Sequence, residues 1–273
     1  MKDRGERATP TELERYRVGS LSKGLRILAL LCSSERAMSL SELAERLGWN
    51  RTTAYRFMAT LQADGYVDQD PVTKTYALTA RVMDLGFSYL NALSFPERSL
   101  PYLNRLSAVT GHSCNLSVLD GAEIVYVARV ASRSLLSINL HVGSRLPAYC
   151  TSMGKVLLAW LPPRELRSVL AGLRIEARTA KTVRNAEELL RLLGTTRRNG
   201  YAVNDQELEI GVRSAAAPIR DGKQRVIAAL NVSVPAAHCT LSQLMRDVVP
   251  RVLEAARDIS TAIGQRTPER LHR

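Results

Sequence analysis

The chain has no apolar run that approaches the roughly 18 residues needed to span a bilayer. Its first 17 residues, MKDRGERATPTELERYR, are polar and of mixed charge, and they lack the apolar core of a signal peptide. These absences predict a cytoplasmic protein that does not contact a membrane. We expect residues 1–17 to form a disordered arm.

Cysteine is scarce and scattered. The sequence has four, none in a CxxC pair: Cys32, Cys114, Cys150 and Cys239. This pattern predicts free thiols in a reducing compartment, with no zinc site and no metal or cofactor. The alternative is an enzyme in which Cys150 pairs with His112, His141 or His238. No local motif supports that pairing, and free cysteine is commonly a small buried apolar residue, so we expect no enzymatic activity.

The length of 273 residues and the 45% apolar content favour two globular domains. The net charge of +12 favours a polyanionic partner, either nucleic acid or an anionic membrane surface. Residues 1–90 hold 13 Lys/Arg and 11 Asp/Glu, so most of the excess lies downstream. Only a local cluster, Arg46, Arg51 and Arg56, makes the first part of the chain basic.

The segment from Ser39 to Leu78 has the pattern of a helix–turn–helix followed by a hairpin. A helix over residues 20–33 should precede it, with an apolar stripe of Leu21, Leu25, Leu28 and Leu31. Ser39 and Glu42 have capping-box spacing at the start of the next helix. The expected buried face of that helix is Leu40, Leu43, Ala44 and Leu47. Gly48 should end it, Trp49 should pack in the turn, and Asn50 should cap the following helix.

The helix after Asn50 carries the side chains expected to meet DNA. Its core side should hold Ala54, Phe57, Met58 and Leu61, which leaves Thr52 and Arg56 pointing away. Arginine can form two hydrogen bonds with guanine, and threonine can contact bases or the thymine methyl group. The expected DNA contacts on this helix are Arg51, Thr52, Thr53, Tyr55 and Arg56. A solvated polar face is the alternative, but the short turn and the hairpin favour DNA binding.

The hairpin predicts a wing. Gly65 should end the preceding helix, with strands starting at Tyr66 and Thr75 and a turn over residues 70–74. Lys74 at the tip is either a further DNA contact, to a phosphate, or a solvated turn residue.

The expected boundaries are a winged helix–turn–helix domain over 18–79, a linker helix over 80–95, a second domain over 96–265 and a basic tail over 266–273. The linker helix should carry a stripe of Val82, Leu85, Tyr89 and Leu93, which pairs with a second subunit or packs on its own wing. Pro96 should start another helix, with a stripe of Leu100, Leu103, Leu106 and Val109.

After Gly111 the pattern changes to strands. Hairpin turns are expected at Asp120-Gly121 and Asp221-Gly222. Strands are expected at HSCNLSVL, EIVYVARVA, LLSINLHV, YAVND, SAAAPIRD and RVIAALNVSV. Helices are expected near Ser152, over 164–171, over 186–199 and from a Thr240 cap to Gly264. The last should bury Leu244, Val248, Val252, Ala255 and Ile259. Strands and helices around one sheet make the fold class α+β, with a mixed α/β sensor-like second domain.

Five segments resemble the IclR (isocitrate lyase regulator) family of transcription factors: SLSKGLRIL, LSELAERLGWNRTTAYRFMATLQADGYV, LPAYCTSMGKVLLA, GYAVNDQELEIGVRSAAAPIRD and AALNVSV. The resemblance covers residues 18–265. CTSMGKVLLA and NDQELEIGVRS are most similar to regulators of aromatic-acid catabolism through the β-ketoadipate pathway.

The resemblance implies a winged helix–turn–helix and a GAF-like effector-binding domain. It also implies homodimers, or homotetramers built as dimers of dimers, on palindromic double-stranded promoter DNA, with a small organic acid as effector. Both repressors and activators occur in the family. By resemblance, the effector contacts are Ser152, Met153, Asn204, Ser214, Asn231 and Ser233, and Leu146 and Tyr149 form an apolar or aromatic wall.

The residues themselves favour an acid at this site. Thr151, Ser152, Met153 and Gly154 lie at a helix start, where free N–H groups and the helix dipole attract a carboxylate. In relatives that bind very small acids, the positions of Asn204, Ser214 and Asn231 carry acid, thiol and hydroxyl groups. A neutral pocket rich in hydroxyls and amides suits an aromatic or dicarboxylic acid. The alternatives are a glyoxylate- or pyruvate-like acid or a sugar acid and, more remotely, a non-specific architectural DNA binder, which would need no second domain.

Overall fold

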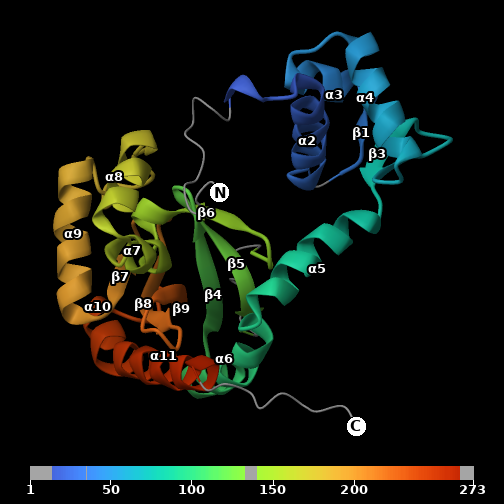
Figure 1. Cartoon of the computed structure of the whole chain (residues 1–273). Helices are drawn as coiled ribbons and strands as arrows, with labels where there is room; N and C mark the ends of the chain where they lie inside the picture. The colour runs from blue at the N-terminus through green and yellow to red at the C-terminus, as the bar shows by residue number, and fades with distance from the viewer. Residues whose placement is uncertain (1–13, 35, 133–139, 265–273) are drawn as a thin grey trace, which may run out of the picture. The chain divides into compact units, whose positions relative to one another are not determined.

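The computed structural model describes residues 14–34, 36–132 and 140–264 (Figure 1). The chain divides into two compact units, residues 1–89 and 90–273, here called the N-terminal and C-terminal units. Most of the predicted arm, the whole basic tail and most of the strand predicted at residues 135–142 lie outside the described residues. No helix in the described part of the chain is long and apolar enough to cross a membrane.

The N-terminal unit is a winged helix–turn–helix. Its elements are α2 (Gly19–Cys32), β1 (Met38–Ser39), α3 (Leu40–Leu47), α4 (Arg51–Ala63), β2 (Val67–Gln69) and β3 (Thr75–Leu78). Their core consists of Ile27, Leu31, Met38, Leu43, Met58, Leu61, Val67 and Tyr76. The hairpin prediction missed β1, which pairs antiparallel with β3 and makes the wing three-stranded in the order β1-β3-β2.

The caps predicted around the turn are present. The Ser39 side chain accepts from the Glu42 amide, and the Glu42 carboxylate accepts from the Ser39 amide. The hydrogen bond from the Ser39 amide is the main cause that lowers the pKa of Glu42 to about 2, and a hydrogen bond from the Arg36 side chain is the next. Gly48 follows α3 in the left-handed region at φ 67°, a conformation that costs little without a Cβ. Leu43 and Ala44 are buried as predicted, whereas Leu40 and Leu47 are only half-buried.

The stripe predicted for α2 is wrong in its first half. Leu31 is buried and Leu28 is half-buried, but Leu21 and Leu25 are 64% and 57% exposed. The deepest residue of α2 is Ile27, which forms the buried face with Leu31 one turn later. The first two turns of α2 extend past the core of the unit, so helical spacing alone could not assign them a partner.

The C-terminal unit is built on a six-stranded antiparallel sheet in the order β6-β5-β4-β9-β8-β7. The strands are β4 (Ser113–Asp120), β5 (Glu123–Val130), β6 (Arg145–Pro147), β7 (Ala202–Asp205), β8 (Val212–Arg220) and β9 (Val226–Pro235). The helices are α6 (Pro96–Thr110), α7 (Ser152–Ala159), α8 (Pro163–Gly172), α9 (Ala186–Asn199), α10 (Leu241–Gln243) and α11 (Val249–Gly264).

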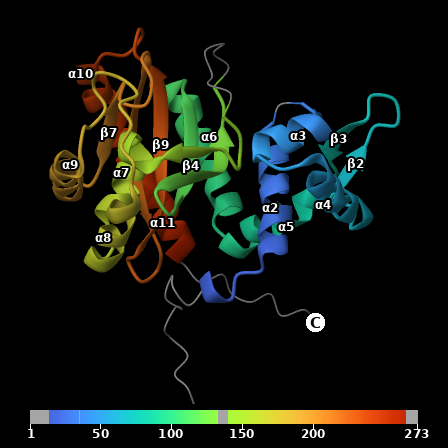
Figure 2. The ribbon, with the colours of Figure 1, turned by 90° about the horizontal axis from the view of Figure 1, so that it is seen from above.

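Helices cover both faces of this sheet (Figures 1 and 2). α6 and α11 pack on one face, over a core that includes Leu103, Leu116 and Leu230. α7 packs on the other face and α9 packs on α7, around a second core that includes Ile124, Met153 and Leu189. The predicted α+β class, with a winged helix–turn–helix and a mixed α/β domain, is confirmed.

Two further helix predictions meet different outcomes. α6 begins at Pro96 as predicted and buries Leu103 and Leu106, but Leu100 and Val109 are exposed. The final helical run buries all five predicted residues: Leu244, Val248, Val252, Ala255 and Ile259. It starts with the Thr240 capping box and passes through a π-helical turn over Leu244–Val248.

The linker helix α5 (Arg81–Leu93) crosses the division between the two units. All of α5 is described and none of its side chains is buried. Leu85 and Tyr89 of the predicted stripe are more than half exposed, so they do not pack on the wing of their own chain. Val82 and Leu93 are half-buried.

Candidate functional site

The predicted DNA-contacting side chains lie on the outer face of α4. Asn50 caps this helix by accepting a hydrogen bond from the Thr53 amide at 2.7 Å. Ala54, Met58 and Leu61 are buried on the inner side. Arg51, Thr52, Tyr55 and Arg56 are therefore exposed, and Thr53 is half-buried. Within the described residues, no acidic side chain forms an ion pair with Arg51 or Arg56, so both guanidinium groups remain available for a polyanion.

Trp49 packs in the turn, as predicted, with its ring centroid 5.8 Å from that of Phe57. The Lys23 ammonium lies 5.7 Å from the Trp49 centroid and the Arg26 guanidinium lies 5.5 Å from it. Two cations of α2 therefore lie beside the turn that precedes α4, a placement that the α2 pattern did not predict.

The wing tip is organised by Asp70. Its Oδ1 accepts from the amides of Val72 at 2.8 Å and Thr73 at 2.7 Å. These backbone bonds lower the pKa of Asp70, so the group stays ionised at neutral pH. Lys74 follows at φ 57° and is exposed. The tip thus presents one cation close to one anion.

The predicted effector contacts of the sheet lie on its α7 face. Directly opposite residues of antiparallel strands share a face. Asn204 is opposite Ser214 and Ser214 is opposite Ser233. Asn231 is opposite Asn115, and Asn115 is opposite Arg129. We call this set, with Ser117, the polar floor: Asn115, Ser117, Arg129, Asn204, Ser214, Asn231 and Ser233.

A hydrogen-bond chain crosses the polar floor. Arg129 Nη1 donates to Asn115 Oδ1 at 3.1 Å, and Asn115 Nδ2 donates to Asn231 Oδ1 at 2.7 Å. Asn231 Nδ2 then donates to Ser233 Oγ at 3.3 Å. Asn115 and Asn231 are buried, and both the oxygen and the nitrogen of each carboxamide form a hydrogen bond. Burial of these amides is therefore compatible with a stable fold.

The start of α7 lies against the same floor. The hydroxyls of Ser152 and Ser214 are 2.7 Å apart, and the Ser117 hydroxyl donates to the Met153 sulfur at 3.2 Å. Thr151 caps α7 by accepting from the Gly154 amide at 3.1 Å. Ser152, Met153 and Gly154 are buried. The structure thus brings the predicted α7 residues onto the predicted sheet residues.

A buried ion pair joins α7 to the loop that follows β7. Lys155 Nζ donates to Glu207 Oε1 at 2.5 Å and to the carbonyl of Val203 at 2.6 Å. Asn204 holds the adjacent loop, because its Oδ1 accepts from the Glu207 amide and its Nδ2 donates to the Cys150 carbonyl. Asn204 is thus held by backbone groups rather than by the serines of the floor.

The two predicted wall residues belong to the apolar core under α7. Leu146 is half-buried on β6, and Tyr149 is buried in the turn that precedes α7. The Tyr149 hydroxyl donates to the carbonyl of Glu176 at 2.9 Å and accepts from its amide at 3.2 Å. Tyr126 of β5 is also buried in this core, and burial raises its pKa to about 12, so its phenol is neutral.

The prediction missed five polar groups around the site: Asn115, Ser117, Arg129, Lys155 and Glu207. The strand Ser113–Asp120 did carry a signal, because Ser113, Asn115 and Ser117 alternate with apolar residues. Alternation of this kind usually indicates a solvated face. Here the polar face is buried beneath α7 instead.

Cys150 does not have the surroundings of a nucleophile. Its thiol donates to the Pro147 carbonyl at 3.8 Å. Burial raises its pKa to about 11, whereas reactive cysteines have lowered pKa values. His112 lies near His238. Burial is the main cause that lowers the pKa of His112, and the charge of His238 lowers it further. Among the described residues, no group of three or more His, Cys, Asp or Glu side chains could hold a metal ion.

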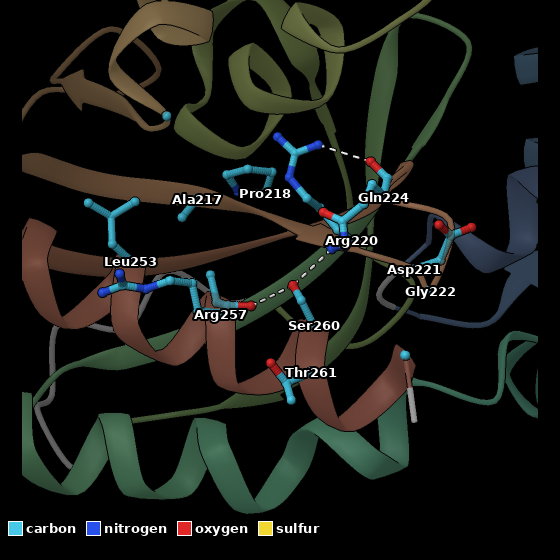
Figure 3. A pocket seen from close by; sticks show the side chains of 13 residues that line it. Ala217, Pro218, Arg220, Asp221, Gly222, Gln224, Leu253, Arg257, Ser260 and Thr261 are labelled. Atoms are coloured by element: carbon cyan, nitrogen blue, oxygen red, sulfur yellow. Dashed lines mark hydrogen bonds between the residues drawn. The ribbon is translucent and has the colours of Figure 1, made fainter. Parts of the chain in front are cut away.

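A hollow of about 690 Å³ lies elsewhere in the unit, between the β8–β9 hairpin and the end of α11 (Figure 3). None of the predicted effector contacts lines it. Its polar groups bind one another: the Arg220 amide donates to Ser260 Oγ, and the Arg220 guanidinium donates to the Gln224 carbonyl. The polar floor therefore remains the candidate effector site.

Comparison with known proteins gives a consistent assignment. The model of the IclR helix-turn-helix domain matches residues 20–71, and that of the bacterial transcriptional regulator IclR C-terminal matches residues 87–261. The chain is 38% identical to the Pca regulon regulatory protein of Pseudomonas putida over 241 residues, which are 88% of this chain and 82% of that protein.

Two solved structures show the same architecture. A transcriptional regulator from Rhodococcus sp. RHA1 matches with a TM-score of 0.77 and 42% identity, over 90% of this chain and 98% of that chain. An IclR homolog from Microbacterium hydrocarbonoxydans, complexed with 4-hydroxybenzoate, matches with a TM-score of 0.76 and 26% identity over the same shares. The family models cover both units, and the chain belongs to the IclR family of bacterial transcriptional regulators.

Proposed function

We propose that this regulator binds a palindromic promoter site through α4 and its wing, and that a small organic acid at the polar floor modulates this binding. The proposed effector is an aromatic acid or another intermediate of the β-ketoadipate pathway. The observation that carries the proposal is the contact between the start of α7 and the polar floor, centred on the Ser152–Ser214 pair. The predicted cytoplasmic location and the GAF-like character of the second domain stay predictions.

The chemistry of this contact favours an anion. A helix start presents free N–H groups and the positive end of the helix dipole. Ser152, Ser214 and Ser233 add hydroxyls that can donate to carboxylate oxygens. Leu146, Tyr126 and Tyr149 supply an apolar and aromatic surround. The similarity to a Pca regulon regulatory protein and to a homolog complexed with 4-hydroxybenzoate supports an aromatic acid.

Assembly into homodimers or dimers of dimers is part of the proposal. The helix α2, its N-cap residue and the helix α5 leave large apolar side chains exposed: Val18, Leu21, Leu25, Met83, Leu85, Phe87 and Tyr89. Exposed apolar residues in such numbers favour cover by another chain. Sedimentation of the purified protein measures the state, and a monomer at micromolar concentration would contradict it.

A thermal-shift screen tests the effector. We expect protocatechuate, 4-hydroxybenzoate, β-ketoadipate or muconate to raise the melting temperature, because a ligand that binds the native state stabilises it by mass action. Pyruvate and glyoxylate represent the alternative of a smaller acid. A shift with these two alone would replace the aromatic acid by a small one, and no shift with any of the six would remove the proposed class of effector.

Ser152→Ala should weaken binding of the acid found in that screen. The substitution removes a hydroxyl at the α7 start and leaves Ser214 without its 2.7 Å partner. It should cost about 1–3 kcal/mol of binding free energy, measured by calorimetry. Alanine is preferable to a large residue, because Ser152 is fully buried and a bulky side chain would disrupt packing. Binding as tight as that of the unchanged protein would place the effector elsewhere.

Arg56→Ala should weaken binding to the specific operator by about 1–3 kcal/mol and relax base preference nearby. Arg56 is exposed on α4 and lacks an acidic partner among the described residues, so its removal should not alter the fold. Fluorescence anisotropy with operator and random duplexes measures the effect. Arg167→Ala on α8 is the control, because Arg167 is also exposed and also lacks an ion pair among the described residues. An equal loss on both duplexes would show that Arg56 contacts only phosphate.

A further inference from the structure

We propose that Arg129 binds the carboxylate of the effector and makes the polar floor selective for acids that have a second polar end. This inference rests on the proposed function and names a residue that the sequence pattern did not assign. Arg129 projects from β5, is half-buried, and reaches the fully buried Asn115 on β4. Through Asn115 it joins Asn231 and Ser233, two of the predicted effector contacts.

The guanidinium sets the direction of this hydrogen-bond chain. Because arginine only donates, Asn115 must turn its oxygen toward Arg129 and its amide nitrogen toward Asn231. Asn231 must then accept with its oxygen and donate from its nitrogen to Ser233. The Ser233 oxygen is thus an acceptor within the chain, and its own proton is free to donate onward. The polar floor therefore presents donors, which suits a carboxylate better than a neutral amide.

The charges around the floor leave Arg129 as a source of positive potential. Within the described residues, its guanidinium has no carboxylate partner. Lys155 of α7 is neutralised by Glu207. Arg213 pairs with Asp205 at 2.6 Å on the opposite face of the sheet from Ser214. Arg178 lies near Cys150 and adds positive potential at the start of α7. Tyr126 on the same strand remains a neutral phenol at physiological pH. Arginine is also the side chain best shaped for a carboxylate, because its planar fork can donate two parallel hydrogen bonds.

The arrangement specifies the length of the acid. One donor group lies at Arg129 over β4, and the other lies at the Ser152–Ser214 pair over β8, with β9 between them. Adjacent strands are about 4.8 Å apart, and Ser214 lies two residues along β8 from Ala216, the residue opposite Asn231, so the two donor groups are about 12 Å apart across the sheet. A hydroxylated benzoate or an extended dicarboxylate can present a polar atom to each end, whereas pyruvate and glyoxylate are too short to do so.

Calorimetric titration of the full chain with protocatechuate and 4-hydroxybenzoate, and with the carboxamide of each, tests the proposal. We expect the unchanged protein to prefer each acid over its amide. Arg129→Gln should weaken acid binding by roughly 10- to 100-fold, the range for a hydrogen bond to a charged group, and change amide binding little. Arg105→Gln is the matched control, because Arg105 pairs with Asp258 on the α6–α11 side of the sheet. It should change neither affinity.

Arg129→Lys keeps the positive charge and a hydrogen-bond donor for Asn115. This variant is used for the test if Arg129→Gln does not fold. It should keep the preference for the acid but bind it about tenfold more weakly, because the fork is lost. Acid binding as tight as that of the unchanged protein in either folded variant would overturn the role of Arg129 and leave the proposed function intact. If the unchanged protein binds neither acid, the aromatic effector and this inference both fail.

Discussion

Replacing Gly154 by alanine should strongly destabilise the C-terminal unit, because a Cβ there meets closer atoms than at any other glycine of the described residues. A Cβ at this position would lie 2.6 Å from the Ala148 carbonyl carbon, and closer still to the Ala148 oxygen and Cα. These are backbone atoms of the turn that leads into α7, so no flexible side chain can move aside. We expect a loss of about 3 kcal/mol or more in the free energy of unfolding.

Urea unfolding followed by tryptophan fluorescence measures this loss. The two tryptophans separate the units, because Trp160 follows α7 and Trp49 lies in the helix–turn–helix. In a Trp49→Phe background, the Gly154→Ala variant should therefore unfold at a lower urea concentration than the protein with Gly154, as reported by Trp160. Gly172→Ala at the end of α8 is the control, since a Cβ there meets no atom within 4 Å. Equal midpoints for the Gly154→Ala and Gly172→Ala variants would show that α7 does not approach Ala148 so closely.

Lys155→Met should cost about 3–5 kcal/mol, because it leaves the Glu207 carboxylate buried without its cation. Both side chains are at least 89% buried, and Glu207 Oε2 already lacks a hydrogen-bond partner among the described residues. Methionine has nearly the length of lysine, so the change removes the charge with little change in volume. Urea unfolding monitored at Trp160 again gives the free energy.

The double variant Lys155→Met with Glu207→Leu separates charge from packing. Replacing a buried ion pair by apolar residues of similar volume is often neutral or stabilising, so the double variant should recover most of the loss. A double variant as unstable as the single one would show that the loop around Asn204 needs the hydrogen bonds rather than the charge balance. A single variant within about 0.5 kcal/mol of the unchanged protein, the size of an ordinary surface effect, would contradict the burial of the pair.

Local sequence signals predicted the caps and turns correctly. Ser39 with Glu42, Gly48, Asn50 and Thr240 all act within one turn of a helix, so neighbouring residues contain the whole interaction. Apolar stripes were less reliable. Leu25 and Leu85 fit helical spacing but are exposed, because spacing says which residues share a face and not whether another element covers that face.

The candidate site shows the same limit. The resemblance to the family named Ser152, Ser214, Asn231 and Ser233, and the structure brings them together. The sequence predicted a neutral pocket, yet the sheet register sets Arg129 opposite Asn115 and so introduces a cation. That pair lies within the β4–β5 hairpin, but its link to the predicted contacts Asn231 and Ser233 requires β4 to pair with β9, more than 90 residues further along the chain.

Local sequence patterns were enough to assign the class of this protein: a helix–turn–helix with its caps, an outer face of arginine and threonine, and motifs of the IclR family. These features are local, and short-range hydrogen bonds and helical periodicity define them. The packing of distant segments, in contrast, sets which polar residues are buried, which cations are neutralised, and why Gly154 must lack a side chain. Each of those outcomes depends on how α7 and distant strands meet, because burial and charge pairing are properties of contacts between segments.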